Sequence, residues 1–227
     1  MGVAPRHIAI DGPVASGKST VARLLAARLH CLFLDTGALY RAVAYVAIAR
    51  DVSPDDPLAV GRLVDTLDLR IESDSRTALG YRLLADGVPL EVELFSTAVS
   101  RAVSPIAAMP HVRKQLIDVQ REFARGEDVV MAGRDIGTVV LPDARFKFYL
   151  TASLDARVDR RLAELRAGGS SMSREALRAE IEMRDLRDSS RTASPLVKAP
   201  DAVEFDTSGI PVEEVVARLE NAVTAAP

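Results

Sequence analysis

Residues 12 to 20 read GPVASGKST and combine a glycine-rich turn with a lysine and two hydroxyl side chains. Gly12 and the run Gly17, Lys18 and Ser19 have the spacing of a phosphate-binding loop, in which backbone N–H groups close around an anion. In such a loop the lysine reaches the β and γ phosphates and the serine hydroxyl ligates Mg²⁺. The predicted triphosphate-binding residues are Gly12, Pro13, Val14, Ala15, Ser16, Gly17, Lys18, Ser19 and Thr20, with Ser19 on the metal.

Several classes of nucleotide-binding protein share this loop, and the rest of the sequence excludes two of them. A GTPase needs an Asn-Lys-x-Asp motif to read guanine, but the sole asparagine is Asn221, near the C-terminus. A motor or transporter ATPase is expected to carry an apolar strand that ends in an acidic pair, whereas the best candidate here ends in MAGRD. The remaining class is a small-molecule kinase, which moves the γ-phosphoryl group onto a bound acceptor.

Such a kinase needs a second anion site, because two polyanions must be brought together and aligned. The candidates are arginines at strand ends and in a charged C-terminal segment: Arg41, Arg134, Arg184, Arg187 and Arg191. Positions 184, 188 and 191 share one face of a predicted helix by their spacing. The same run is also typical of an exposed, salt-bridged helix, and the composition leaves both interpretations open.

Five short apolar runs indicate the elements that position these residues: 7–11, 31–35, 128–133, 146–150 and 202–206. Most are followed by a polar or glycine-containing turn and then by a segment with helical periodicity. That alternation predicts an α/β fold of three layers, a parallel five-stranded sheet with helices on both faces.

Two segments depart from this pattern. Residues 51–100 hold short strand-like runs, LDLRIES and YRLLADGVPLEV, with Asp86 and Gly87 at a predicted hairpin turn. Residues 152–192 are strongly charged and predict two helices joined by GGSSMS, in the position of a lid. We expect one kinase unit over 1–227, with a core (1–35, 105–150 and 193–227), a monophosphate-binding region with an antiparallel insertion (36–104) and a lid with its flanking helices (151–192).

Composition narrows the setting of the protein. The chain has 227 residues, a net charge of −3 and one cysteine, Cys31. The acidic balance argues against a nucleic-acid partner, because sequence-independent binding relies on phosphate neutralisation. The longest apolar stretch, 42–49, is too short to span a bilayer, and no apolar leader opens the chain. We therefore expect a cytoplasmic protein with neither a membrane nor a nucleic-acid partner.

The motifs, taken together, resemble the bacterial cytidylate kinase family. IDGPVASGKST, LDTGALYRAVA, VSPIAAMPHVR, MAGRDIGTVVLPDA, FYLTAS and RDLRDSSRTASPL occur in that order, and the resemblance runs from about residue 6 to the C-terminus. It implies a P-loop nucleoside monophosphate kinase that uses Mg²⁺ and ATP to convert CMP or dCMP into CDP or dCDP. It also implies an extra segment in the monophosphate-binding region, in agreement with the change of pattern at 51–100.

The resemblance also implies roles at the matching positions. The phosphate of the monophosphate is expected at Thr36, Arg41, Arg134 and Arg191, the cytosine at Ser104, Arg113 and Asp135, and the ribose at Arg184 and Asp188. The residues expected to act in catalysis are Lys18, Arg134, Arg184 and Arg191.

Chemistry supports the assignment of Asp135, because the amino group of cytosine is a donor that a carboxylate accepts. Uracil presents a carbonyl there, so poor use of UMP is expected. Asp135 could instead pair with Arg134 or cap a helix. Asp35, also at a strand end, could cap the following helix or hold a Mg²⁺-bound water, and the sequence does not choose between them.

One segment departs from the family pattern: 94–100 reads LFSTAVS and lacks the arginine that the resemblance leads us to expect. Two rival functions stay open. The first is a kinase for another acceptor, such as UMP, AMP or a non-nucleotide alcohol. The second is a nucleotide-dependent regulator, which would bind ATP without acceptor-stimulated turnover. We expect the protein to be a monomer.

Overall fold

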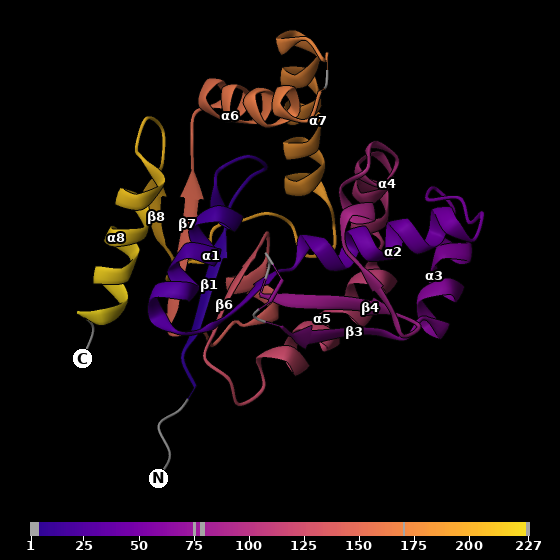
Figure 1. The fold of residues 1–227 in the computed structure, drawn as a ribbon, viewed down its shortest axis with the longest axis horizontal. Helices are drawn as coiled ribbons and strands as arrows, with labels where there is room; N and C mark the ends of the chain where they lie inside the picture. The colour runs from indigo at the N-terminus through magenta and orange to yellow at the C-terminus, as the bar shows by residue number, and fades with distance from the viewer. Residues whose placement is uncertain (1–4, 75, 78–79, 170, 226–227) are drawn as a thin grey trace.

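A computed structural model describes residues 5–74, 76–77, 80–169 and 171–225. Its main sheet is parallel throughout, with the strand order β2-β6-β1-β7-β8 (Figure 1). The strands are β1 (His7–Asp11), β2 (Leu32–Asp35), β6 (Val129–Gly133), β7 (Phe146–Thr151) and β8 (Val203–Asp206). Each agrees with a predicted apolar run to within one residue at either end, and the helices around the sheet confirm the predicted α/β class.

The central strands are apolar along their whole length because both of their faces are covered. Ile8, Ala9 and Ile10 of β1 are fully buried, as are the first four residues of β6. The helices are α1 (Lys18–Leu29), α2 (Gly37–Ala49), α3 (Pro57–Thr66), α4 (Thr97–Ala108), α5 (Pro110–Ala124), α6 (Leu154–Ala167), α7 (Arg174–Ser190) and α8 (Val212–Thr224). Helix α1 packs against β6 and beside α8, which closes the core on that side.

The segment that departs from the α/β pattern forms a second, antiparallel sheet of β3 (Leu69–Ser73), β4 (Tyr81–Ala85) and β5 (Val88–Leu90). The predicted hairpin turn is present, with Asp86 at φ 50° and Gly87 at φ 78°. Two consecutive positive φ angles match the twist of a two-residue hairpin. A 3-10 turn, η1 (Val92–Phe95), then leads into α4.

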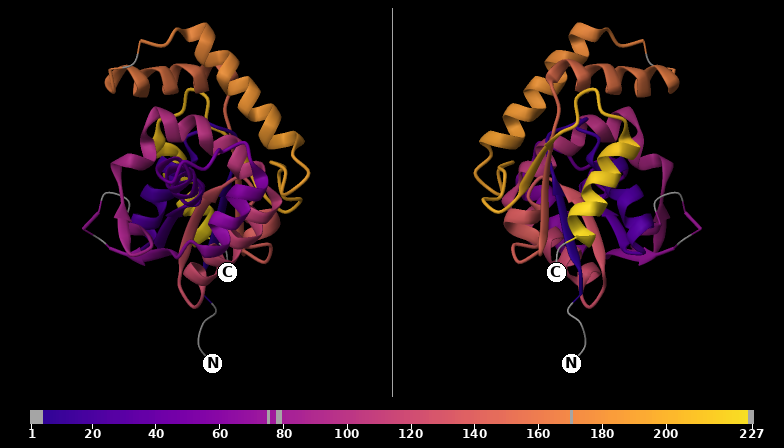
Figure 2. Two further views of the ribbon diagram at one scale, coloured as in Figure 1. Left: turned by 90° about the vertical axis from the view of Figure 1, so that its right-hand side faces the viewer. Right: turned by 90° about the vertical axis from the view of Figure 1, so that its left-hand side faces the viewer.

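Helices α6 and α7 lie beyond the carboxyl ends of the strands, and α7 descends from this layer toward the core (Figure 2). Val158 and Leu162 of α6 pack against Leu177 and Ile181 of α7. The predicted GGSSMS connection includes Ser170, which lies outside the described residues. Within the described part of the chain, none of the helices combines the length and the apolar character needed to cross a bilayer.

Candidate active site

The glycine-rich loop follows β1 at the centre of the sheet, where carboxyl ends of parallel strands gather ligand-binding loops. Gly12 is required by a close approach, since a Cβ there would lie 2.2 Å from the carbonyl oxygen of Leu150. Gly17 has φ 85° and opens α1 in the left-handed region, which favours glycine. The loop is thus shaped by its backbone.

Two features of this loop fit a bound anion. The Oγ atom of Ser16 is buried and has no hydrogen-bond partner among the described residues. Helix α1 has no side-chain cap, so within the described part of the chain its first N–H groups have no side-chain acceptor, and they carry the positive end of the helix dipole. Phosphate oxygens would satisfy these groups. Ser19, at the second position of α1 and partly buried, offers the hydroxyl oxygen predicted for Mg²⁺, which commonly takes one or two protein oxygens together with substrate phosphates.

Lys18 is buried, and its Nζ donates to the carbonyl oxygen of Pro13 at 3.0 Å. Burial lowers the pKa of this ammonium well below its usual range, and the positive charges of Arg134 and Arg184 lower the pKa further. The carboxylates of Asp35 and Asp188 act in the opposite direction. A bound polyanion would stabilise the charged form of the Lys18 ammonium, which burial and the neighbouring positive charges disfavour.

Asp35 and Thr36 follow β2 at the same edge of the sheet. The Oδ1 atom of Asp35 accepts from the N–H of Gly37 at 3.0 Å, which is a capping contact at the start of α2. Thr36 is buried, and its hydroxyl donates to the carbonyl oxygen of Ala132 at 3.0 Å. The structure therefore supports the capping role of Asp35, while its charge also acts on Lys18.

Asp135 follows β6 and lies in a buried ion pair with Arg113 of α5. The Nη2 atom of Arg113 donates to Oδ2 of Asp135 at 2.5 Å, and Nη2 of Arg191 lies 4.0 Å from Oδ1. The Arg113 guanidinium also lies 5.2 Å from the centre of the Tyr40 ring. Burial raises the pKa of Tyr40 to about 12, so the phenol stays neutral. Asp135 was expected either to read the base, to pair with Arg134 or to cap a helix. Its arginine partner in the structure is Arg113, and not Arg134.

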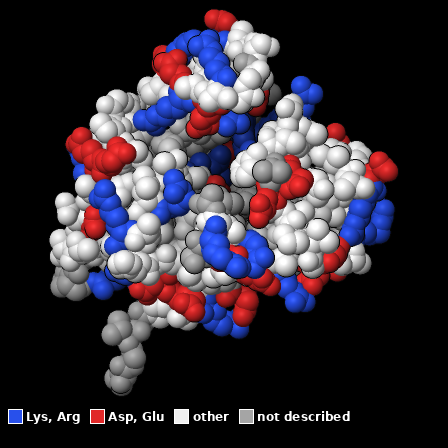
Figure 3. Space-filling view, viewed as in Figure 1, with Lys and Arg blue, Asp and Glu red and all other residues white. Residues whose placement is uncertain are grey.

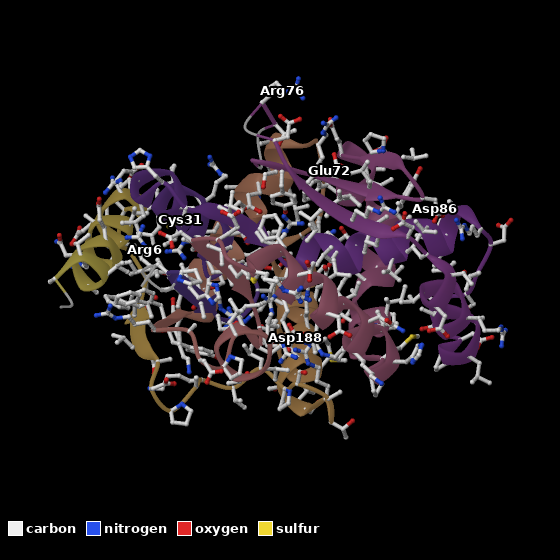
Figure 4. All side chains as sticks on the ribbon, turned by 90° about the horizontal axis from the view of Figure 1, so that it is seen from below. Arg6, Cys31, Glu72, Arg76, Asp86 and Asp188 are labelled. Atoms are coloured by element: carbon white, nitrogen blue, oxygen red, sulfur yellow. The ribbon has the colours of Figure 1, made fainter. Side chains whose placement is uncertain are left out.

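Arg134 instead turns toward α7, where its Nε donates to Oδ2 of Asp188 at 2.8 Å. Burial alone would raise the pKa of Asp188, but the charge and hydrogen bond of Arg134, together with the charges of Arg184 and Arg191, outweigh burial and lower the pKa. Burial and the charge of Arg134 lower the pKa of Arg184 to about 10. The structure thus gathers Lys18, Arg134, Arg184 and Asp188 into one electrostatic cluster, near the middle of the molecule where Asp188 is labelled in Figure 4.

The two remaining residues predicted for the acceptor nucleotide lie on α2 and α4. Arg41 donates through Nη1 to the carbonyl oxygen of Leu94 at 3.1 Å and to the hydroxyl of Ser100 at 3.0 Å. Ser104 lines an open groove of about 800 Å³ together with Arg187 and Arg191. Figure 3 shows basic and acidic side chains at the bottom of a hollow beneath α6 and α7.

Arg191 lies at the C-terminal end of the helical face that Arg184 and Asp188 share. Helix α7 ends at Ser190, but Arg191 keeps a helical φ of −63° and its N–H donates to the carbonyl oxygen of Arg187 at 3.2 Å, so its side chain leaves the chain on the predicted face. The chain turns back here, and the N–H of Leu196 donates to the carbonyl oxygen of Asp188 at 2.7 Å. Arg191 still lies 3.9 Å from Asp188, through Nη1 and Oδ1. Helical spacing therefore brings Arg191 to Asp188, and the turn begins after Arg191.

Sequence reasoning missed Asp11, the last residue of β1. Its buried carboxylate accepts from the N–H groups of Ile136 and Gly137, each at 2.8 Å. These residues open the π-type turn η2 (Ile136–Val140), directly after Arg134 and Asp135. Burial raises the pKa of Asp11 to about 6. The strand-end rule applied to Asp35 and Asp135 would have found it.

Two arginines of α6 were also missed, and they connect the lid helices to the loop. Nη1 of Arg157 donates to the carbonyl oxygen of Val14 at 3.2 Å and to Oδ2 of Asp185 at 2.5 Å. Nη1 of Arg160 donates to the hydroxyl of Thr207 at 3.0 Å and lies 3.4 Å from the carbonyl oxygen of Ser16. No spacing in the sequence indicates these long-range contacts.

Comparison with known proteins now places the chain. The family model described as cytidylate kinase matches residues 8–225. The chain belongs to the cytidylate kinase family. A cytidylate kinase of Pelotomaculum thermopropionicum is 47% identical over 96% of each chain, and one of Symbiobacterium thermophilum is 45% identical over 93% of each. A solved structure of an uncharacterized protein from Eubacterium ventriosum covers 97% of this chain and 99% of its own at TM-score 0.52 and 12% identity, a likeness of fold alone.

Proposed function

We propose that this protein transfers the γ-phosphoryl group of ATP to CMP or dCMP, giving ADP and CDP or dCDP. The observation that carries the proposal is a cluster of cations that extends from the glycine-rich loop to Asp135. The charges of Arg134 and Arg184 act on Lys18 of the loop. Arg113 and Arg191 lie on either side of the Asp135 carboxylate. Membership of the cytidylate kinase family supports it. The proposal includes three earlier expectations: the protein is a monomer, it acts in the cytoplasm, and its chain is divided into a core, a monophosphate-binding region and a lid.

On the donor side, the loop would hold the ATP phosphates through its backbone N–H groups, with Lys18 on the β and γ phosphates. In the transfer, the bond from the γ phosphorus to the β–γ bridging oxygen breaks, and a bond forms to a phosphate oxygen of the acceptor. Negative charge then gathers on the leaving β phosphate, where Lys18 and the start of α1 stabilise it. Mg²⁺, with Ser19 as its protein ligand, would supply further charge neutralisation on the phosphates when bound.

On the acceptor side, the phosphate of CMP would lie among Thr36, Arg41, Arg134 and Arg191. Arginines suit this place because their planar forks match phosphate oxygens and offset the repulsion between two polyanions. Arg184 and Asp188 of α7 would contact the ribose, so closing of the lid helices would bring them to the nucleotide. Closure would also exclude water, which limits ATP hydrolysis.

Asp135 and Arg113, with Ser104, would select the base. Cytosine presents an amino donor to the carboxylate and acceptor atoms to the guanidinium. Uracil would set a carbonyl oxygen against the carboxylate and an N–H against the guanidinium, so both contacts would be lost. Sites that hydrogen-bond a substrate reject analogues that leave such buried groups unpaired. The arrangement therefore favours CMP and dCMP over UMP.

The test is ADP formation from Mg²⁺-ATP with CMP, dCMP, UMP, AMP, GMP and dTMP offered separately. A Lys18→Ala preparation serves as the control for contaminating kinases. Stimulation by CMP and dCMP is the expected result. Stimulation mainly by another acceptor would keep the kinase and remove the base-reading role of Asp135 and Arg113. ATP binding without stimulation by any acceptor, from folded protein, would favour the nucleotide-dependent regulator.

A further inference from the structure

The side chain of Arg41 is held in a specific orientation by η1 and the first turn of α4. Both hydrogens of its Nη1 have an acceptor, the carbonyl oxygen of Leu94 at 3.1 Å and the hydroxyl of Ser100 at 3.0 Å. Leu94 is 1% exposed, so the position of its carbonyl group is fixed by packing in the core. The rotation of the guanidinium about its own axis is thereby determined.

The opposite edge of the same guanidinium is left for a ligand. Among the described residues, Nε and Nη2 of Arg41 have no hydrogen-bond partner, and these two atoms form the side-on edge of the fork. Two parallel N–H groups at this spacing match two oxygens of a phosphate. The charges of Asp35 and Arg134 act on Arg41, so the guanidinium belongs to the same electrostatic neighbourhood as the cluster that the proposed acceptor phosphate would enter.

An exposed aromatic ring covers the guanidinium. Phe95 is 61% exposed, although a large apolar side chain gains most from burial, and its ring centre lies 5.7 Å from Cζ of Arg41. At this distance the negative face of the ring attracts the cation. Phe95 belongs to the 94–100 segment, where the family resemblance led us to expect an arginine. The segment therefore contributes an aromatic face in place of a second positive charge.

We propose that Ser100 and Phe95 are positioning residues that aim the Nε and Nη2 edge of Arg41 at the phosphate of the monophosphate substrate. The proposal rests on the proposed function, in which Arg41 binds that phosphate. It makes this region an active part of substrate binding, since η1 and the first turn of α4 together determine the orientation of a phosphate-binding arginine.

The test is a double-mutant cycle with CMP affinity, measured by calorimetry without ATP, as the readout. We expect Ser100→Ala to weaken CMP binding about five-fold, because it removes one acceptor of a charged donor in a partly exposed place. Phe95→Ala and Phe95→Leu should each weaken it about three-fold, the size of an exposed cation–π contact. Phe95→Tyr keeps the ring and should bind CMP like the wild type. Val88→Ala is the matched control, an equally exposed apolar residue of the insertion at 60%.

The cycle is closed by repeating Ser100→Ala and Phe95→Ala in an Arg41→Ala background, where neither should weaken CMP binding further. The positioning role would be overturned by equal losses of CMP affinity in both backgrounds, or by no loss in the wild-type background. If Arg41→Ala weakens CMP binding in the same experiment, the proposed function, in which Arg41 binds the substrate phosphate, is still upheld. If Arg41→Ala itself binds CMP normally, both the positioning role and the assignment of Arg41 to the phosphate fail. Thermal unfolding midpoints and ATP affinity should be unchanged in all Phe95 and Ser100 variants, which separates positioning from a general loss of structure.

Discussion

The two ends of the site are built in different ways. The proposed donor end is a run of nine contiguous residues, 12–20, in which Gly12, Ala15 and Gly17 have positive φ angles and backbone N–H groups would supply most of the phosphate contacts. The proposed acceptor end gathers side chains from several elements, and its carboxylate, Asp135, is buried against Arg113 with exposed fractions of 6% and 3% for the two side chains. A backbone site is available before the ligand arrives. In a site made of charged side chains, these charges must pair with one another as long as no ligand is bound.

The largest difference between the two ends should appear with Lys18→Ala. We expect the turnover number to fall by about 10³-fold, because charge stabilisation on the transferred phosphates is lost. The fold should persist, since removal of a buried ammonium relieves a cost of desolvation. Acceptor-stimulated ADP formation and the thermal midpoint are the measurements. If Lys18→Ala keeps a tenth of the wild-type turnover number or more, the assignment of Lys18 to the phosphates of ATP is wrong.

Asp135→Ala should behave in the opposite way and damage stability as well as activity. It leaves Arg113 buried without its partner, which costs about 4 kcal/mol of unfolding free energy. The affinity for ATP should be unchanged, because the donor loop is intact, while CMP turnover should be largely lost. Urea unfolding and ATP calorimetry measure the two effects. If ATP and CMP binding weakened equally, the two ends would not be separate.

Asp11 lies between the two ends and gives a dependence on pH. Its pKa is raised from 3.8 to about 6. The folded state therefore binds more protons than the unfolded state between these values, so this group favours folding below pH 3.8 and the contribution is lost as pH rises through about 6. Relative to Asp11→Asn, the wild type should lose at most about 3 kcal/mol of unfolding free energy from pH 4 to pH 7.

Urea unfolding of both proteins across this range measures the difference, and the neutral asparagine is the control for all other titrating groups. A constant difference would show that Asp11 stays ionised throughout. The hydrogen bonds from Ile136 and Gly137 to Asp11 would then make no pH-dependent contribution to stability.

The smallest expected effect belongs to the connection between the lid helices and the donor loop. Arg157→Ala removes the contacts with Val14 and Asp185, so the loop loses support and the KM for ATP should rise about ten-fold, the size of one hydrogen bond to a charged group. CMP affinity without ATP should not change. Arg166→Ala, an exposed arginine on the same helix, is the control. An equal rise in both variants would mean that α6 acts only through its overall charge.

The sequence predicts the donor end better than the acceptor end for a physical reason. A glycine-rich loop between a strand and a helix is a local pattern, and so are the five apolar strands and the Asp86–Gly87 hairpin. The pairs Arg113–Asp135 and Arg134–Asp188 join residues 22 and 54 positions apart, which only the tertiary fold brings together. The resemblance to known kinases named these residues, but not their partners. The hydrogen bonds from Ile136 and Gly137 to Asp11 likewise depend on contacts that no local spacing encodes.

The central claim is that Asp135 reads the base of the acceptor, and the ratio of kcat/KM for CMP to that for UMP tests it most directly. In the wild type we expect a ratio of at least about 10², because uracil would leave buried groups unpaired. In Asp135→Asn the ratio should fall toward one, since an amide can turn either its oxygen or its nitrogen toward the base. A wild-type ratio near one, or a high ratio that survives Asp135→Asn, would contradict the account.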